Sequence, residues 1–418
     1  MRLAPPRDPV TIELDGHPIV AERGEPVAFA LVASGNLTVA RSPKFHRPRG
    51  PSCLRAACDG CLARVDGVPN VMTCRVPAVE GTRVETQNVL GSRETDLLRM
   101  TDWFFPEGLN HNEVFAGVPG AQRVLQGLAR RVAGLGRLPD ASDDGARPAR
   151  RRELDALVVG AGPAGMATAL ELAARGRQVE VVEDDLDFGG CLKALPPDDL
   201  GPWRPLLDAF AEAIRGRALT VRLRSTAAGI YGDDVLVAGL EGVEVVTCRT
   251  LVLATGAHDG AIAFEGNDIP GVMSARAGCR LLSRGVVPGE RVVIVVAGSE
   301  GSFAGVYARA QPTATVVTGV PTRALGGTRV RHVDVETPEG PKRLRCDALL
   351  IDAPMAPAYE LCCQAGAEVT HLPRGYLVRT RAGGVIRERV FAVGEVVGTR
   401  LDPPAIHRAA TEIANHPE

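Results

Sequence analysis

Three features are scarce in this sequence of 418 residues: an excess of one charge sign, long apolar runs and closely spaced cysteines outside one segment. The 48 basic and 50 acidic residues give a formal charge of −2, which offers no bulk attraction for nucleic acid or an anionic membrane. No window approaches the ~18 uninterrupted apolar residues of a membrane-spanning helix, and the start, MRLAPPRDPVTIELDG, has no signal-peptide core. The sequence therefore predicts a cytoplasmic protein with no nucleic-acid partner and no transmembrane segment.

Ten cysteines are too few for a disulfide scaffold. Cys191 has no second cysteine four or five residues on, and Cys279 has no C-x-x-C partner, so a redox disulfide is not expected. Six cysteines are predicted to be ordinary core or surface thiols: Cys191, Cys248, Cys279, Cys346, Cys362 and Cys363. The remaining four crowd into positions 53 to 74, which indicates a metal site.

The clustered thiols are Cys53, Cys58, Cys61 and Cys74. Their C-x4-C-x2-C spacing, followed by a more distant cysteine, is typical of plant-type [2Fe-2S] domains. A hairpin expected at Asp66-Gly67 would return the fourth thiol to the third. A zinc site, normally built from two C-x2-C knuckles, and four unrelated thiols are the alternatives. An iron cluster carries one electron at a time, and the segment offers no acid, base or nucleophile for an organic substrate, so its predicted role is relay.

A basic loop, KFHRPRG, precedes the cysteines and contains Lys44, His46, Arg47 and Arg49. One interpretation is a solvated basic surface. The other is that these cations, together with Arg55, bind a nucleotide phosphate or the acidic groups of a partner near the cluster.

A dinucleotide-binding motif, G-x-G-x-x-G, follows the apolar strand expected from Leu154 and opens a helix. Its glycines allow a tight turn, approach of the pyrophosphate and close packing of helix on strand. Glu183 ends the next strand, where an acid binds ribose hydroxyls, and the acids that follow it disfavour a 2′-phosphate. The alternative is a βαβ unit without ligand. The predicted contacts are Gly160, Gly162, Pro163, Ala164, Gly165, Glu183 and Asp184.

Two later segments favour FAD over NAD at this site, although NAD stays open as the alternative. LVLATGAH contains the turn Ala254-Thr255-Gly256, which is typical of the point where two-dinucleotide oxidoreductases cross between their domains. FAVGEVVG contains Gly394-Glu395, where a Gly-acid pair usually meets the flavin's ribityl and phosphate, with Glu395 in place of the usual Asp.

A second nucleotide-type unit begins near Arg291, and its motif is degraded. Aligning Gly298 with the first glycine places Glu300 and Phe303 where the second and third glycines belong. A carboxylate and a bulky ring at these positions oppose binding. Loss of the nucleotide is predicted, with a displaced binding mode, using Gly301 and Gly305, as the alternative.

These patterns predict an α/β fold: a tandem Rossmann-like, disulfide-reductase-like module that binds two dinucleotides, behind an N-terminal β-grasp ferredoxin-like domain. The expected domains are a [2Fe-2S] domain at 1–97, connecting helices and a linker at 98–152, an FAD-binding domain at 153–265 and 386–418, and a degenerate NAD-like domain at 266–385.

The sequence resembles the α subunits of heteromeric sarcosine oxidase and their relatives in hydrogen cyanide synthase, opine oxidase and hydroxyproline dehydrogenase complexes. The resemblance rests on KFHRPRG, the cysteine spacing, RRVAGLGRLP, GAGPAG, ATGAH and GNDIPGVMSARAG. It implies a non-covalent dinucleotide in a subunit that assists a separate amino-acid-oxidase-type subunit carrying the substrate flavin. Asp259-Gly260 replaces the family's usual Glu-Arg-Pro, and the folate-binding half of sarcosine oxidase α is not expected.

The leading functional prediction is an electron-transfer subunit of a hetero-oligomeric amine or amino-acid oxidase or dehydrogenase, with no catalytic residue on this chain. The alternatives are a stand-alone NADH-dependent reductase that feeds its own cluster, and a structural partner with vestigial ligands. The degraded second site argues against the reductase, because hydride entry needs a nicotinamide pocket. The intact cysteine set argues against the structural partner.

Overall fold

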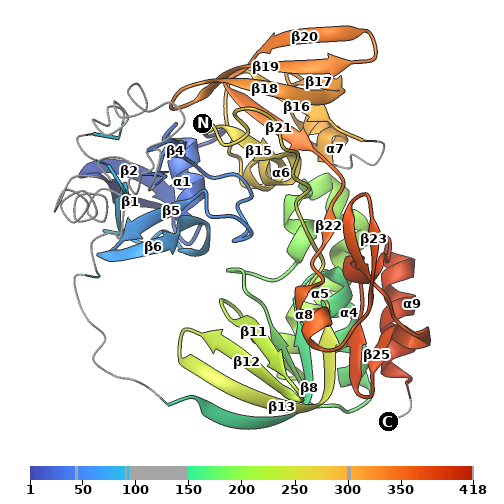
Figure 1. Ribbon diagram of the computed structural model, residues 1–418. Helices are drawn as coiled ribbons and strands as arrows, with labels where there is room; N and C mark the ends of the chain where they lie inside the picture. The colour runs from blue at the N-terminus through green and yellow to red at the C-terminus, as the bar shows by residue number, and fades with distance from the viewer. Residues whose placement is uncertain (43–45, 90–91, 94–138, 140–147, 299–302, 417–418) are drawn as a thin grey trace, which may run out of the picture. The chain divides into compact units, whose positions relative to one another are not determined.

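The computed structural model (Figure 1) describes residues 1–42, 46–89, 92–93, 139, 148–298 and 303–416. Contacts divide the chain into two compact units, each built from two separate stretches. Unit 1 comprises Met1–Ser142 and Ala261–Asp352, and unit 2 comprises Asp143–Gly260 and Ala353–Glu418. Across the described ranges, no helix combines the length and apolarity needed to cross a membrane.

The first stretch of unit 1 forms a ferredoxin-like lobe (residues 1–93) around a five-stranded sheet of order β2-β1-β7-β5-β6. The strands are β1 (Pro9–Leu14), β2 (His17–Glu22), β5 (Leu62–Val65), β6 (Val68–Met72) and β7 (Arg83–Glu85), with the short pair β3 (Ala40–Arg41) and β4 (Pro48–Arg49) alongside. Helix α1 (Val27–Ala33) follows Pro26, whose fixed φ suits the entry to a helix. Alternate residues Val10, Ile12 and Leu14 of β1 point into the core, which gives the lobe one apolar layer.

The second stretch of unit 1 forms a NAD-like lobe (residues 261–352). Its parallel sheet has the order β15-β21-β16-β17, and a three-stranded antiparallel sheet has the order β18-β19-β20. The parallel strands are β15 (Val272–Ser274), β16 (Val292–Val296), β17 (Thr315–Thr318) and β21 (Ala348–Asp352), with helices α6 (Ala275–Leu282) and α7 (Phe303–Ala310). The antiparallel strands are β18 (Val320–Gly326), β19 (Val330–Thr337) and β20 (Gly340–Arg345). The apolar run of β16 is buried, as a parallel strand requires.

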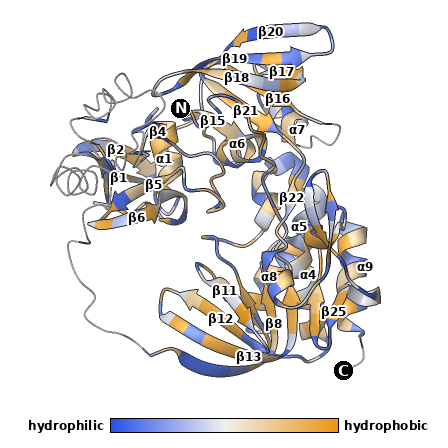
Figure 2. Cartoon of the chain, viewed as in Figure 1, coloured by the Kyte–Doolittle hydropathy of each residue, from blue (hydrophilic) through white to orange (hydrophobic). Residues whose placement is uncertain are grey.

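Unit 2 is a doubly covered sheet. Strands β10-β9-β8-β13 run parallel, β12 and β11 continue the sheet antiparallel, and β26 pairs with β13. The strands are β8 (Arg150–Val159), β9 (Val179–Val182), β10 (Leu219–Arg222), β11 (Thr226–Tyr231), β12 (Asp234–Gly239), β13 (Gly242–Leu253), β25 (Val385–Arg387) and β26 (Val390–Ala392). Figure 2 shows β8 changing from hydrophilic to hydrophobic along its length, in line with its exposed start and buried end.

Helices α4 (Pro163–Ala174), α5 (Arg204–Arg215) and α9 (Pro403–Ala414) belong to unit 2. Their apolar residues share a core with Val158 of β8 and Val181 of β9. The neighbouring residues Leu157 and Val182 belong to a second core with β11, β12 and β13. Because successive strand residues point to opposite faces, the two cores lie on opposite sides of one sheet.

The two domain borders differ from the expected positions. Unit 2 resumes at Ala353, whereas the sequence placed the return at residue 386. The reason is that Cys362 and Ala365, at helix α8 (Glu360–Gln364), and Val378 of β24 (Gly375–Val378) join the second core of unit 2. Strand β8 begins inside the expected linker, and most of the segment 98–152 lies outside the described residues.

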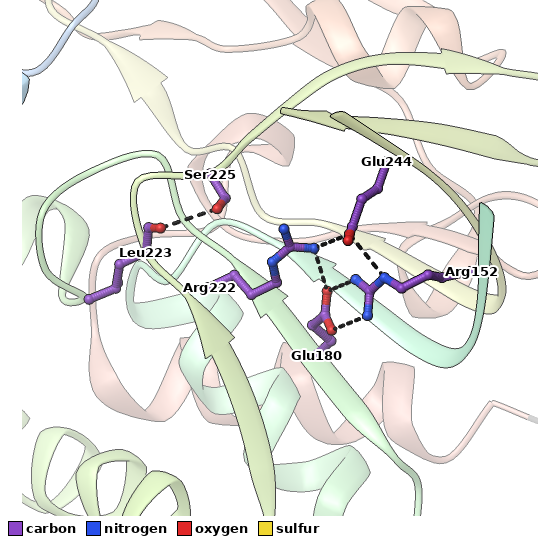
Figure 3. Close-up of polar contacts among 6 residues, drawn as sticks. All are labelled: Arg152, Glu180, Arg222, Leu223, Ser225 and Glu244. Carbon is purple, nitrogen blue, oxygen red and sulfur yellow. Dashed lines mark hydrogen bonds and ion pairs between the residues drawn. The ribbon is translucent and has the colours of Figure 1, made fainter. Parts of the chain in front are cut away.

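Four charged side chains form a network across adjacent strands of unit 2 (Figure 3). Arg152 bonds both oxygens of Glu180, at 2.7 and 3.1 Å, and contacts Glu244 at 2.9 Å. Arg222 contacts the same two carboxylates, Glu244 closely and Glu180 at 3.5 Å. The side chains of Glu180 and Glu244 are only 8% and 11% exposed, so the two guanidinium groups take the place of water in stabilising each carboxylate charge.

Arg222→Met is expected to lower the free energy of unfolding of unit 2 by about 2 kcal/mol, because two poorly hydrated carboxylates would then share one guanidinium. The matched control is Arg151→Met on the same strand as Arg152, since the Arg151–Asp234 pair, at 3.0 Å, leaves Arg151 71% exposed. Urea titration checks the difference. Equal losses of unfolding free energy in the two variants would show that burial does not make the Arg222 ion pairs stronger than the exposed Arg151–Asp234 pair.

Candidate functional site

The four clustered thiols come together in the ferredoxin-like lobe as two pairs. Cys53 shares a hydrogen bond with Cys58, and Cys61 shares one with Cys74. Three are buried and Cys58 is half-buried, and all are free thiols. In the described part of the chain, no three Cys, His, Asp or Glu side chains converge as a site for one ion.

The predicted hairpin between the third and fourth cysteines is confirmed. Strands β5 and β6 pair with Leu62 opposite Met72, and the Thr73 N–H donates to the Cys61 carbonyl at 3.2 Å. This pairing places Cys74, which is buried and follows in the sequence after β6, beside Cys61.

The loop between the first two cysteines wraps its backbone around the thiols. Leu54 and Ala56 have left-handed φ values of 54° and 62°, which non-glycine residues rarely adopt. The Arg55 and Ala57 N–H groups hydrogen-bond to the Cys53 sulfur, the former at 3.5 Å. Strained backbone that turns N–H groups towards sulfur fits thiolates that share negative charge with a cluster.

Hydrogen bonding favours one thiolate in each pair. The bond from Cys53 lowers the pKa of Cys58 to about 7, and the bond from Cys74 lowers the pKa of Cys61. The donating thiols, Cys53 and Cys74, have raised pKa values for the same reason, with burial adding to it. Two thiol pairs with an easily ionised member each fit a two-iron cluster, in which every iron needs two thiolates.

The basic loop is only partly a free surface. Lys44 lies outside the described residues. His46 is buried, with Nδ1 3.2 Å from the Asn88 carbonyl, and Arg49 pairs with Asp268 of the NAD-like lobe at 3.0 Å. Arg47 stays exposed. The structure thus gives Arg49 a partner within the chain.

The dinucleotide motif of unit 2 forms the tight strand-to-helix turn that the sequence predicts. Gly160 directly follows β8 and has a φ of 103°, and a Cβ there would lie 2.4 Å from the Ala254 carbonyl oxygen. A Cβ on Gly165 would lie 1.9 Å from the Gly160 oxygen. By contrast, a Cβ on Gly162 would meet, among the described residues, only Gly190 Cα at 4.0 Å. Open space beside an uncapped helix N-terminus at Pro163 suits a pyrophosphate.

The two later segments meet this turn. The Ala254 carbonyl contacts Gly160, and Gly394 lies so close to Ala164 that an added Cβ would be 2.8 Å from its Cβ. The Thr255 hydroxyl donates to the Ala358 carbonyl at 2.7 Å, which fixes the turn that includes Gly256. Glu395 follows Gly394 and lies 4.0 Å from the guanidinium of Arg374. The motif, the ATG turn and the Gly-acid pair therefore share one place.

Glu183 is buried where the ribose is expected. It accepts hydrogen bonds from the backbone N–H groups of Ala161, at 2.6 Å, and Asp185, at 3.1 Å. Burial, reinforced by the charge of Asp184, raises the pKa of Glu183 to about 7. The Lys193 ammonium, paired with Asp185 at 2.5 Å, partly opposes this shift. The backbone bonds show that the carboxylate already faces the glycine turn.

Glu183→Gln is expected to have opposite effects on the ligand-free fold and on ligand binding. Because the folded pKa lies above the ordinary value of 4.5, the stabilising contribution of protonated Glu183 is complete below that value and is lost as pH rises through about 7. The wild-type apoprotein should lose up to about 3 kcal/mol of unfolding free energy over this window.

The glutamine variant should lack that pH dependence, since it carries no titrating proton, and should bind dinucleotide more weakly because it lacks the carboxylate acceptor. Denaturant titrations between about pH 5 and 8 check the first effect, and ligand titration checks the second. If the unfolding free energies of variant and wild type changed with pH in the same way, this would contradict the argument that burial raises the pKa of Glu183.

Sequence reasoning missed Gly189-Gly190 as part of this site. The Gly189 N–H donates to the Ala161 carbonyl at 2.8 Å, and Gly190 Cα lies against Gly162. The pair stands directly before Cys191, and its two adjacent glycines were the available signal, because a paired glycine often marks close backbone approach.

In the second nucleotide-type unit, an internal carboxylate bonds the described start of the helix. Asp352, at the end of β21, accepts hydrogen bonds from the Phe303 and Ala304 N–H groups at the start of α7, the latter at 2.7 Å. Burial raises the pKa of Asp352. Phe303 is buried against the helix, while Glu300 and Gly301 lie outside the described residues. The helix terminus that would attract a phosphate is thus already bound to an internal carboxylate.

Family models and known proteins agree with this geometry. Residues 7–89 match the 2Fe-2S iron-sulfur cluster binding domain, and residues 154–325 match the pyridine nucleotide-disulphide oxidoreductase family. The structure of L-proline dehydrogenase from P. horikoshii superposes with a TM-score of 0.75 and 20% identity, over 99% of this chain and 74% of that one. This likeness confirms the predicted fold.

Sequence relatives include the sarcosine oxidase α subunit of Rhizobium meliloti, 27% identical over 86% of this chain and 41% of that protein. An opine oxidase subunit of Agrobacterium tumefaciens is 35% identical over 34% of this chain and 32% of its own length. The hydrogen cyanide synthase subunit HcnB of Pseudomonas protegens is 33% identical over 35% and 33%. The chain spans less than half the length of these relatives.

The fold and its two sites are those of an oxidoreductase that joins a [2Fe-2S] domain to a two-dinucleotide module, with a [2Fe-2S] cluster and FAD as its cofactors. The chain is similar to the sarcosine oxidase α subunit, the matching opine oxidase subunit and HcnB, in agreement with the resemblance seen in the sequence.

Proposed function

We propose that this chain is the electron-transfer subunit of a heteromeric FAD-dependent oxidase or dehydrogenase that acts on CH–NH donors. Candidate donors are amines and amino acids of the sarcosine, hydroxyproline, opine or glycine type. The observation that carries the proposal is the contrast between the two nucleotide-type units: one is open at Gly162, and the other is closed by Asp352.

Within this function, the cluster would be held by Cys53, Cys58, Cys61 and Cys74. The dinucleotide would be held by Gly160, Gly162, Pro163, Ala164, Gly165, Glu183, Asp184, Ala254, Thr255, Gly256, Gly394 and Glu395. FAD exchanges electrons in pairs or singly, whereas the cluster takes one at a time. The chain's own residues would bind and orient the cofactors: the α4 N-terminus would face the pyrophosphate and Glu183 would accept from the ribose, while the ferredoxin-like lobe keeps three of the four thiols buried.

Substrate oxidation would occur on a partner subunit with its own flavin, in a hetero-oligomer. The names of the relatives support this, since each is a subunit of an oxidase or synthase. Exposed Arg47 beside the cluster loop would suit an acidic docking face. A cytoplasmic location stays a prediction.

A stand-alone NADH-dependent reductase is the second candidate, and one experiment separates the two. The purified chain is mixed with NADH and an artificial acceptor, alone and after co-expression with its oxidase-type partner. We expect no turnover with NADH alone and amine-dependent turnover in the complex. Rapid NADH oxidation by the isolated chain would reject the proposal. Release and chromatography of the bound nucleotide should yield FAD, and NAD in its place would contradict the assignment of the Gly160 site.

A further inference from the structure

The NAD-like lobe contacts the cluster loop (residues 49–61) through a short segment, residues 268–274. Asp268 accepts from the Arg49 guanidinium at 3.0 Å, with side chains 26% and 36% exposed. The Ser274 N–H donates to the Ser52 carbonyl at 3.1 Å. Ser52 directly precedes Cys53, the first cluster cysteine. The segment therefore contacts the cluster loop at both of its ends, through Ser274 at Ser52 and through Asp268 at Arg49, where the loop begins.

Between these two contacts the backbones pack without room for a side chain. A Cβ on Gly50 would lie 2.1 Å from the Leu37 carbonyl oxygen and 3.2 Å from Pro270 Cβ. A Cβ on Gly60 would lie 2.3 Å from the Gly50 oxygen and 3.6 Å from the Cys58 sulfur. Gly50 therefore packs near Pro270 and against Gly60, and Gly60 packs near the Cys58 sulfur, so this part of the loop has little room to move.

The segment is itself firmly held. The Pro270 carbonyl accepts from the Val330 N–H at 3.0 Å, and the Gly271 carbonyl accepts from the Leu349 N–H at 2.9 Å. Ser274 caps α6, its hydroxyl accepting from the Ala277 N–H at 3.0 Å. Two sheets and a helix cap of the NAD-like lobe thus fix the residues that touch the cluster loop.

We propose that the NAD-like lobe serves as the mount of the cluster loop, and that Asp268 is a positioning residue which acts on the cluster through Arg49. This role goes beyond electron transfer, because it assigns a structural function to a lobe whose own nucleotide site is closed by Asp352. Contacts outside the ligands control the N–H bonds to sulfur and the access of water, on which cluster stability and reduction potential depend.

The test compares Asp268→Ala with Glu265→Ala in the full chain. Glu265 belongs to the same lobe and forms an ion pair of the same length, 3.0 Å, with Arg323, away from the cluster loop. Asp268→Ala should release iron to a chelator about two- to fivefold faster, the range expected for a partly exposed ion pair. It should also raise amide exchange over residues 49–61 and alter the EPR spectrum of the reduced cluster, while Glu265→Ala matches wild type.

Arg49→Ala should reproduce these changes, and the double variant should add nothing, because both substitutions remove one interaction. Iron and sulfide are first assayed in the wild type: their absence would reject the proposed function itself. If the cluster is present and Asp268→Ala behaves as Glu265→Ala does in all three measurements, the mount is rejected while the proposed function stands.

Discussion

A Cys58→Ala variant is expected to lose both irons and both sulfides of the cluster, together with its visible absorption above the flavin bands. Cys58 is the thiol of its pair that ionises more readily, with a pKa of about 7, and its removal leaves Cys53 without its hydrogen-bond partner. Three thiolates cannot complete two four-coordinate irons. Bound FAD should be unchanged, because the FAD site belongs to unit 2 and has its own core.

Iron, labile sulfide and released FAD are measured on the same sample. Cys363→Ala is the control, since this half-buried thiol of α8 lies in unit 2. In a complex that is active with an amine, Cys58→Ala should also stop electron delivery to the cluster's acceptor. Retention of two irons per chain in Cys58→Ala would refute the ligand assignment, and one zinc without sulfide in the wild type would refute the cluster.

Gly162→Ala is expected to fold normally and to bind FAD at least about fivefold more weakly. A methyl group fits in the free protein, where the nearest atom is 4.0 Å away. The same methyl group would occupy the space into which the pyrophosphate must come, and overpacking of this kind costs about 1–3 kcal/mol. Gly165→Ala should differ, because its methyl group would collide with the Gly160 carbonyl at 1.9 Å and disturb the fold itself.

Thermal denaturation and FAD titration of the apoprotein separate these effects. Gly201→Ala is the matched control, as no atom lies within 4 Å of the added carbon. Weak binding in Gly162→Ala with an unchanged melting temperature would support a ligand role. Wild-type affinity in that variant would mean that the pyrophosphate does not pass over Gly162.

The features predicted correctly from the sequence are those that depend on neighbours along the chain. The Asp66-Gly67 hairpin follows from turn chemistry and brings Cys74 to Cys61. The turn at Gly160 follows from a glycine motif between strand and helix. In each case a short motif contains the residues that decide the geometry.

What the sequence did not reveal depends on partners far along the chain. Nothing near Asp352 indicates that its carboxylate bonds the start of α7, 48 residues away at Ala304. Arg49 looked like a docking cation because Asp268, its partner, lies 219 residues away. The return to unit 2 lies at Ala353 and not at the expected residue 386. The local sequence around Cys362 and Ala365 does not tell which of the two cores these residues join.

The interleaving of the two units has a consequence for biosynthesis. Strand β13 of unit 2 pairs with β26, which is translated much later, and Arg49 at the start of the cluster loop contacts a residue synthesised 219 positions after it. Such long-range contacts cannot form while the chain is still short. On the ribosome, the cluster loop can therefore make its contacts with the NAD-like lobe only after residue 274 is synthesised, and β13 can pair with β26 only after residue 392. Iron loading of a fully supported cluster loop is thus possible only after residues 268–274 have been synthesised.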